Sequence, residues 1–412
     1  MTSESELLCE ACRSVPGDTD SAEVTHSEQI SNKFEEAIAT RRVNNPKLIQ
    51  VAPMLDVTDR DFRYFTRLVS KHTELWTEMV SAEAIVHNSE NEEKLSGLLE
   101  LDDIEHPIVL QLGSNKPEYL KRAAEISRSN YGYSEINLNA GCPSCKVAGA
   151  GEFGAALMKN ASLLKDCLNA LSVGGTASLK TRLGVDSLDS DTYFASVIDT
   201  AGEEISRLTG KLDLSVHCRI ALLNGISPAQ NRSIPPLNYP RAFRVLKERP
   251  AIKWTLNGGV TSLAQAEDLL VEGGENMIGV MIGRAVQNNP VILWDADRRI
   301  YGKERNPETV SSRRMLLEAY CDYLHDRYNK DGFHGEGKSS IFASTGSVFT
   351  ALKPVMGVFS GMPGNKKWRN SIDLLARDVT LRTEGGPAAV LEACIKETDG
   401  SVFDEPIDKN QK

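Results

Sequence analysis

The sequence predicts an α/β fold, a (β/α)8 TIM barrel followed by a smaller all-helical C-terminal domain. Short apolar runs alternate with amphipathic stretches eight times over roughly 250 residues, which is the usual size of such a barrel. Polar residues and glycines recur where the apolar runs end, and this favours a barrel over a doubly wound sheet. Beyond about residue 301 the strand pattern stops and only helical patterns remain.

Eight apolar runs have the length expected of buried strands. They cover residues 48–53, 75–80, 107–113, 135–141, 177–184, 214–218, 252–259 and 277–283. The amphipathic stretches between them predict helices at residues 60–70, 117–129, 161–171, 191–208, 239–248 and 262–272. Four further helices are expected at residues 311–328, 344–359, 365–378 and 388–396.

These elements divide the chain into four parts. Residues 1–46 are acidic with little apolar periodicity, so we expect a disordered extension with one short helix at residues 34–42. Residues 47–305 form the predicted catalytic barrel and residues 306–396 the helical domain. Residues 397–412 are expected to be a disordered tail.

The composition is that of a soluble globular protein, because 41% of the 412 residues are hydrophobic. No stretch approaches the roughly 18 apolar residues of a membrane helix, and the first thirty residues lack a signal or transit pattern. We therefore expect a cytoplasmic protein that binds no membrane, with an organelle left open. The net charge of −10 is uneven, since residues 1–46 carry nine acidic and four basic residues. Overall acidity thus does not exclude a local RNA-binding face.

The eight cysteines lack the spacing of a disulfide framework, which indicates free thiols in a reducing compartment. Cys9 and Cys12 form a lone CxxC pair, and because zinc needs four ligands we expect no metal site. Cys142 and Cys145 have the spacing of thiol–disulfide oxidoreductases, but no thioredoxin-like pattern surrounds them. A milder hypothesis is that oxidation links these two thiols and silences the protein.

The most informative segment is NLNAGCPSCKVAGAGEFGAALM at residues 137–158. It runs from the end of the fourth strand into a glycine-rich loop, where Gly141 and Pro143 hold Cys142 on a tight turn. Catalytic groups of α/β barrels lie at the carboxyl ends of strands, and glycines let a flat ligand approach the backbone. Cys142 is therefore the predicted catalytic residue, whereas Cys167 and Cys218 are expected to be buried structural thiols.

The ends of the last two strands match the phosphate site of many barrels. Asn257, Gly258 and Gly259 follow the seventh strand, and Gly283 and Arg284 follow the eighth. Small residues expose backbone N–H groups there, and an arginine adds positive charge. We expect a phosphate group to bind at this place.

Several motifs follow one another along the chain. They are VAPMLDVTDRDFR (51–63), TEMV (77–80), LQLG (110–113), EINLNAGCPS (135–144), LKTRLGVD (179–186), VHCR (216–219), NGISPAQNRSIPPLNY (224–239), NGGV (257–260) and GVMIGRA (279–285). In sequence and in order they resemble the motifs of the tRNA-dihydrouridine synthases. The segments NRSIPPLNY and FSGMPGNKKWR (359–369) resemble the A subfamily, which reduces D-loop uridines at about position 20 or 20a of tRNA.

The resemblance implies an oxidoreductase that uses FMN and NADPH and binds tRNA as a monomer. Reduced FMN passes hydride to C6 of a flipped uracil while a cysteine, here Cys142, protonates C5, and Lys180 stabilises negative charge on the flavin. The implied FMN-binding residues are Pro53, Met54, Gln111, Lys180, His217, Asn257, Gly258, Gly259, Gly283 and Arg284. The implied substrate-binding residues are Asn139, Arg182, Arg219, Asn231, Arg232, Lys366, Lys367 and Arg369.

Two questions stay open at the level of the sequence. The basic residues around Trp368 suit an RNA backbone and a stacked base, but the same pattern fits a solvated helix face with a buried tryptophan.

The motifs also suit an FMN-dependent TIM-barrel reductase or dehydrogenase of a free pyrimidine or small enone. A third reading is an RNA-binding protein without chemistry, which the joint presence of Cys142, Lys180 and His217 disfavours.

Overall fold

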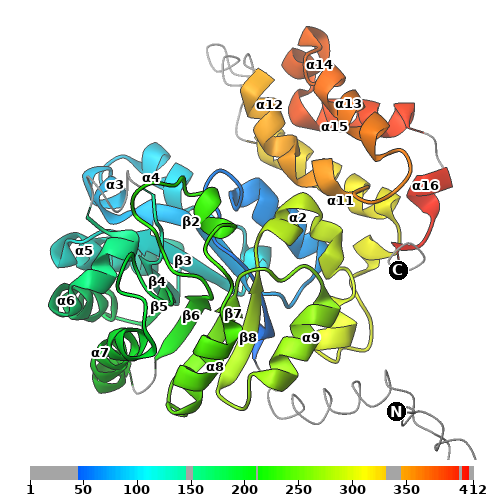
Figure 1. Ribbon diagram of the computed structural model, residues 1–412. Helices are drawn as coiled ribbons and strands as arrows, with labels where there is room; N and C mark the ends of the chain where they lie inside the picture. The colour runs from blue at the N-terminus through cyan, green and yellow to red at the C-terminus, as the bar shows by residue number, and fades with distance from the viewer. Residues whose placement is uncertain (1–44, 145–151, 210–211, 331–344, 399–400, 408–412) are drawn as a thin grey trace, which may run out of the picture.

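Eight parallel strands close into a barrel, as the sequence predicts (Figure 1). The computed structural model describes residues 45–144, 152–209, 212–330, 345–398 and 401–407. The strands are β1 (Ile49–Val51), β2 (Leu75–Ser81), β3 (Ile108–Gly113), β4 (Glu135–Ala140), β5 (Thr176–Arg182), β6 (Asp213–His217), β7 (Lys253–Asn257) and β8 (Met277–Ile282). The predicted helix at 34–42, Cys9, Cys12 and Cys145 lie outside the described residues.

Neighbouring strands pair in the order β1-β8-β7-β6-β5-β4-β3-β2, and the ring closes between β1 and β2. The N–H of Val51 donates to the carbonyl oxygen of Glu74 at 2.9 Å, and the N–H of Glu74 donates to that of Ile49 at 3.0 Å. These two bonds join β1 to the residue before β2. A doubly wound sheet has two open edges, so that alternative is wrong.

All six predicted barrel helices are confirmed within about two residues at either end. They are α2 (Arg60–Val69), α5 (Pro117–Tyr131), α6 (Ala161–Leu171), α7 (Asp191–Thr209), α8 (Tyr239–Lys247) and α9 (Leu263–Glu272). The sequence pattern misses α3 (Ala82–His87), α4 (Glu92–Leu99) and α10 (Arg284–Asn288), which are too short to show helical periodicity. No helix within the described residues is long and apolar enough to span a membrane.

A buried lysine closes the amino-terminal end of the barrel. The Nζ atom of Lys47 lies 2.6 Å from a carboxylate oxygen of Glu135, 3.2 Å from one of Asp213 and 3.9 Å from one of Glu74. Burial opposes the charge on this ammonium group, but the three carboxylates outweigh that effect and raise the pKa of Lys47. Burial also raises the pKa of Glu74 to about 7. No sequence motif pointed to this cluster.

Beyond the barrel the chain is helical. The helices are α11 (Arg313–Lys330), α12 (Thr345–Leu352), α13 (Asn365–Leu375), α14 (Val379–Glu384), α15 (Gly386–Glu397) and α16 (Ser401–Asp404). The last of them lies in the part of the chain expected to be a disordered tail. Phe403 is fully buried with its ring 5.1 Å from that of Phe359, and Ile407 is also buried. Apolar side chains therefore hold residues 401–407 in place, and for these residues the expectation of disorder is wrong.

A buried acid joins the helical region to the barrel. Asp61 of α2 accepts hydrogen bonds from the hydroxyls of Tyr323 and Tyr328, both at 2.8 Å, and lies 3.3 Å from Nε of Arg327. The ring of Tyr323 also stacks on that of Tyr64, with centroids 3.7 Å apart. Helix α11 is thus fixed against α2, beside the barrel (Figure 1).

Candidate active site

Side-chain amides line the barrel interior toward the carboxyl ends of the strands. Asn139 of β4 donates from Nδ2 to Oε1 of Gln111 on β3, at 2.8 Å. The amides of Gln111 and Asn137 lie 3.0 Å apart. All three side chains are buried, and the strand register puts Asn139 beside Lys180. The predicted residues Gln111 and Asn139 therefore belong to one hydrogen-bonded chain of amides.

The loop that carries Cys142 is held on two sides. Oδ1 of Asn139 accepts hydrogen bonds from the backbone N–H groups of Gly141 at 3.1 Å and of Cys142 at 2.9 Å. From the other side, Nε of Arg182 donates to the carbonyl oxygen of Gly141 at 2.9 Å. Gly141 lies so close to β5 that a Cβ there would be 3.3 Å from the carbonyl carbon of Thr181. Cys142 itself is partly exposed, as a reacting thiol requires.

Lys180 of β5 lies beside the amide chain, since the strand register pairs it with Asn139. Its Nζ donates to Oδ1 of Asn257 at 3.3 Å, and Nδ2 of Asn257 donates in turn to the carbonyl oxygen of Met281 at 2.9 Å. Burial, reinforced by Arg182, lowers the pKa of Lys180 to about 8. The ammonium group is therefore charged at neutral pH and loses its proton under mildly alkaline conditions.

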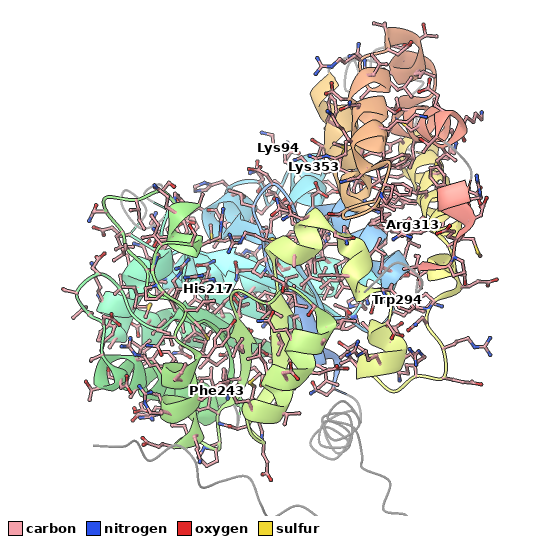
Figure 2. All side chains as sticks on the ribbon, turned by 45° about the vertical axis from the view of Figure 1, so that its right-hand side comes forward. Lys94, His217, Phe243, Trp294, Arg313 and Lys353 are labelled. Carbon is pink, nitrogen blue, oxygen red and sulfur yellow. The ribbon has the colours of Figure 1, made fainter. Side chains whose placement is uncertain are left out.

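His217 ends β6 inside the barrel region (Figure 2). Its Nδ1 is buried without a hydrogen-bond partner among the described residues. Burial and the nearby cations, led by Arg182 and Lys180, hold the pKa of His217 well below its usual range. The imidazole is neutral at neutral pH, so one ring nitrogen is a donor and the other an acceptor. A buried polar atom without a partner is typical of a site that a ligand completes.

Three arginines surround the ends of β6, β7 and β8. Arg284 and Arg232 are exposed, and Nη2 of Arg284 donates to the carbonyl oxygen of Arg232 at 3.0 Å. Arg219 is half-buried and donates to the carbonyl oxygen of Pro235. Among the residues that the structure describes, no carboxylate pairs with any of these arginines. Their unbalanced charge suits an anionic ligand.

The turn after β7 offers backbone donors beside these arginines. Gly258 and Gly259 have φ of +113° and +77°, which glycine adopts without strain. Within the described part of the chain their N–H groups meet no acceptor. Glycine donors, arginines and a neutral histidine fit the phosphate of a mononucleotide such as FMN. The predicted residues Gly283 and Met54 lie close to each other, with the sulfur of Met54 3.6 Å from where a Cβ of Gly283 would be.

The flat part of such a ligand would meet apolar side chains. Met54 is half-buried and packs against a small cluster in the barrel that contains Ala52, Trp76, Val109 and Met281. Pro53 precedes it and is also half-buried. The predicted apolar residues therefore follow β1 and lie at the same end of the barrel as Cys142.

Comparison with known proteins agrees with this geometry. The dihydrouridine synthase (Dus) family model matches residues 50–382. The tRNA-dihydrouridine(20/20a) synthase of Salmonella typhimurium is 36% identical over 349 residues, covering 84% of this chain and 93% of that protein. The chain belongs to the dihydrouridine synthase family. The enzymes of the same name from Escherichia coli K12 and Yersinia pestis are 36% and 35% identical and cover 84% and 82% of this chain and 90% and 89% of their own lengths.

One solved structure, the old yellow enzyme homologue of Zymomonas mobilis, is only weakly similar to this chain. The two share 12% sequence identity and a TM-score of 0.43, over 63% of this chain and 89% of that one. This similarity is too weak to bear on function.

Two of the predicted substrate-binding residues are buried in this dihydrouridine synthase and form hydrogen bonds to its backbone. Asn231 is fully buried, and its amide exchanges two hydrogen bonds of 2.8 Å with the backbone of Leu222. Arg182 is buried and donates from Nη1 to the carbonyl oxygens of Ile220 and Asn231, at 2.9 and 3.0 Å, in addition to its bond with Gly141. Asn231 thus holds its own loop, and Arg182 ties three loops together, rather than presenting free groups at the surface.

The basic patch on α13 divides into exposed charges and a buried ring. Lys366, Lys367 and Arg369 are exposed. Trp368 is fully buried, with its Nε1 donating to the carbonyl oxygen of Val355 at 2.8 Å and its ring 5.2 Å from that of Phe359. Of the two readings left open for this patch, base stacking by Trp368 is excluded, because the ring is part of the core of the helical region. The three exposed basic residues remain predicted contacts of the RNA backbone.

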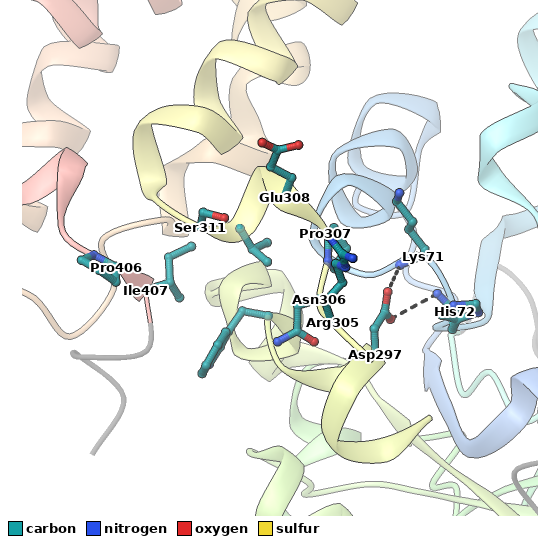
Figure 3. Close-up of a pocket in the computed structure, with 12 residues that line it drawn as sticks. Lys71, His72, Asp297, Arg305, Asn306, Pro307, Glu308, Ser311, Pro406 and Ile407 are labelled. Carbon is teal, nitrogen blue, oxygen red and sulfur yellow. Dashed lines mark hydrogen bonds between the residues drawn. The ribbon is translucent and has the colours of Figure 1, made fainter. Parts of the chain in front are cut away.

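A pocket of about 810 Å³ lies apart from these residues, between the segment after α2 and the segment before α11 (Figure 3). Asp297 projects into it, but its carboxylate accepts from the backbone N–H groups of Lys71 at 2.8 Å and of His72 at 3.3 Å. None of the predicted site residues lines this pocket. Its one buried acid is already paired, so it offers no chemistry for the reaction of this family.

Proposed function

We propose that this chain is a tRNA-dihydrouridine synthase that uses FMN and NADPH to reduce the C5–C6 double bond of D-loop uridines at about position 20 or 20a. The observation that supports it most strongly is Cys142, partly exposed and fixed at the carboxyl end of the barrel near Lys180. Membership in the dihydrouridine synthase family, and relatives named for the 20/20a reaction, support the substrate.

The chemistry divides between the cofactor and the chain. FMN, when bound and reduced by NADPH, would supply hydride to C6 of the uracil. Cys142 donates the proton to C5 from the other side of the ring, as a general acid. Asn139 and Arg182 hold the Cys142 loop through the backbone of Gly141 and Cys142, so that the thiol reaches C5 in one orientation.

Other residues bind the cofactor and balance its charge. Gly258, Gly259 and Arg284 would bind the phosphate through backbone N–H groups and a guanidinium. Lys180, oriented by Asn257, would face the N1 and O2 edge of the flavin, where negative charge develops. Pro53 and Met54 would pack against the ring system.

The tRNA would lie along the basic residues that remain exposed. Arg232 and the three basic residues of α13 have charges available for the phosphates of tRNA, whereas Asn231 has none of its amide groups free. A monomer in the cytoplasm is part of the proposal, since the resemblance leaves the face between barrel and helical region for the tRNA. A flipped uracil would reach Cys142 at the mouth of the barrel.

Dihydrouridine formation tests the proposal directly. Unmodified tRNA is incubated with NADPH and the purified full-length protein, and dihydrouridine is quantified at each position by mass spectrometry. Wild type should form dihydrouridine in the D-loop, Cys142→Ala should not, and Cys167→Ala should behave as wild type because that thiol is fully buried on α6. Reduction of free uridine or uracil but not of tRNA would contradict the proposal and support the small-molecule reductase.

A further inference from the structure

Tyr239 packs against the glycine turn that follows β7. A Cβ added to Gly259 would overlap the side chain of Leu237 and lie 3.1 Å from the hydroxyl oxygen of Tyr239. Tyr239 ends the segment NRSIPPLNY, which resembles a motif of the family. The proposed reaction itself assigns this tyrosine no role. The tyrosine comes from α8, so it approaches the turn from a separate element.

The hydroxyl of Tyr239 donates a hydrogen bond to the carbonyl oxygen of Gly258. In a trans peptide the carbonyl group and the following N–H group point in opposite directions. The bond therefore directs the N–H of Gly259 away from Tyr239. This N–H and that of Gly258 meet no acceptor in the described residues, and Gly259 is exposed. Without such an anchor, a pair of glycines would lose much of its preference for one peptide orientation.

Tyr239 is itself held in place. It is the first residue of α8, whose N-cap residue Asn238 accepts from the N–H of Arg241 at 3.0 Å and donates its own N–H to the carbonyl oxygen of Cys218 at 2.8 Å. The start of α8 is thereby tied to the end of β6. Burial raises the pKa of Tyr239 to about 12, so the hydroxyl keeps its proton at any pH at which the enzyme would work.

We propose that Tyr239 is a positioning residue for the phosphate of the flavin: its hydroxyl fixes the peptide between Gly258 and Gly259 so that the backbone N–H of Gly259 faces the phosphate. The inference rests on the proposed function, since it assumes that FMN binds at this turn. His217 lies 3.3 Å from where a Cβ of Gly258 would be, and Arg219 and Arg284 are close enough to it to lower its pKa. Neither arginine pairs with a carboxylate in the described chain, which suits a phosphate dianion. The role of Tyr239 concerns the phosphate alone and not the isoalloxazine ring.

Riboflavin separates the two parts of the ligand, because it has the ring system but no phosphate. Dissociation constants of FMN and of riboflavin are measured by flavin fluorescence quenching on the full chain stripped of flavin. We expect Tyr239→Phe to weaken FMN binding about tenfold and to leave riboflavin binding unchanged. The control is Tyr133→Phe, which removes a hydroxyl that donates to the carbonyl oxygen of Leu99 at 3.0 Å, at the amino-terminal end of β4.

Each outcome decides between the two proposals. Equal FMN binding by Tyr239→Phe and Tyr133→Phe, with wild type preferring FMN over riboflavin, would overturn the role of Tyr239 and leave the proposed function intact. Equal loss of FMN and riboflavin binding in Tyr239→Phe would show a general structural role and also overturn the inference. Wild type that binds FMN no better than riboflavin would overturn the phosphate site itself, and the proposed cofactor with it.

Discussion

Lys180 gives the proposed reaction a defined alkaline limit. Burial lowers the pKa of this lysine to about 8, so about 90% of the molecules carry the charge at pH 7 and about 10% at pH 9. If the ammonium group balances charge on the reduced flavin, kcat/KM for tRNA should fall about tenfold between these pH values. The assay is dihydrouridine formation at low tRNA concentration with saturating NADPH.

Lys180→Arg separates this effect from other titrations, because a guanidinium does not lose its proton in this range. The variant should be slower at pH 7 but should show no alkaline fall of its own. An alkaline fall of equal size in wild type and Lys180→Arg would therefore refute the assignment to Lys180.

Unfolding cannot explain the expected loss of activity through this lysine. Its pKa in the folded protein is below the ordinary value of 10.5, so between about pH 8 and 10.5 the unfolded chain binds a proton that the folded chain lacks. The free energy of unfolding therefore rises with pH in this window as far as Lys180 contributes. Thermal melts at pH 7 and 9 check this point, since a large drop in Tm at pH 9 would have to come from other groups.

Three further predictions concern other parts of the molecule. Lys47→Met should lower the free energy of unfolding by about 3–5 kcal/mol in urea titrations at pH 8, because it removes the cation that Glu74, Glu135 and Asp213 share. The loss should be smaller at pH 5, where the buried Glu74, with its pKa raised to about 7, is protonated; an equal loss at both pH values would contradict this. Asn139→Ala should slow uridine reduction about 100-fold and change the alkylation rate of Cys142 by iodoacetamide, and an unchanged alkylation rate would remove its positioning role. Replacing Lys366, Lys367 and Arg369 of α13 by neutral residues should lower the slope of log affinity for tRNA against log salt by about 2 to 3. Trp368→Phe should leave this slope unchanged and lower the stability of the protein instead.

Local patterns were enough to predict the strands and most helices. Buried parallel strands are short apolar runs, and the helices between them carry one apolar face, so both signals are present in any window of ten to fifteen residues. The pattern failed at α3 and α10, which have fewer residues than two helical turns need. It failed again at residues 401–407, where burial of Phe403 against a distant aromatic ring orders a segment of weak local preference.

In the candidate site, too, some features could be predicted from local sequence and others could not. The positions of Cys142, Lys180 and the glycines after β7 could be predicted because each lies at or near the carboxyl end of a strand, where a barrel places its reactive groups; their roles stay predictions. The partners of these residues could not be predicted. Arg182 and Asn231 bind carbonyl and amide groups of loops from other strands, and Tyr239 binds the carbonyl group of Gly258.

The sequence by itself determined the order of strands and helices, the family and the residue types at the mouth of the barrel, because these depend on periodicity and on motifs that are contiguous in the chain. Only the tertiary structure decided which polar side chains are free and which are already bound. Closing the barrel brings strand ends from all parts of the chain within hydrogen-bond distance of one another. A buried polar group must find a partner among those neighbours, and which neighbours it has is a property of the closed barrel and not of any one segment.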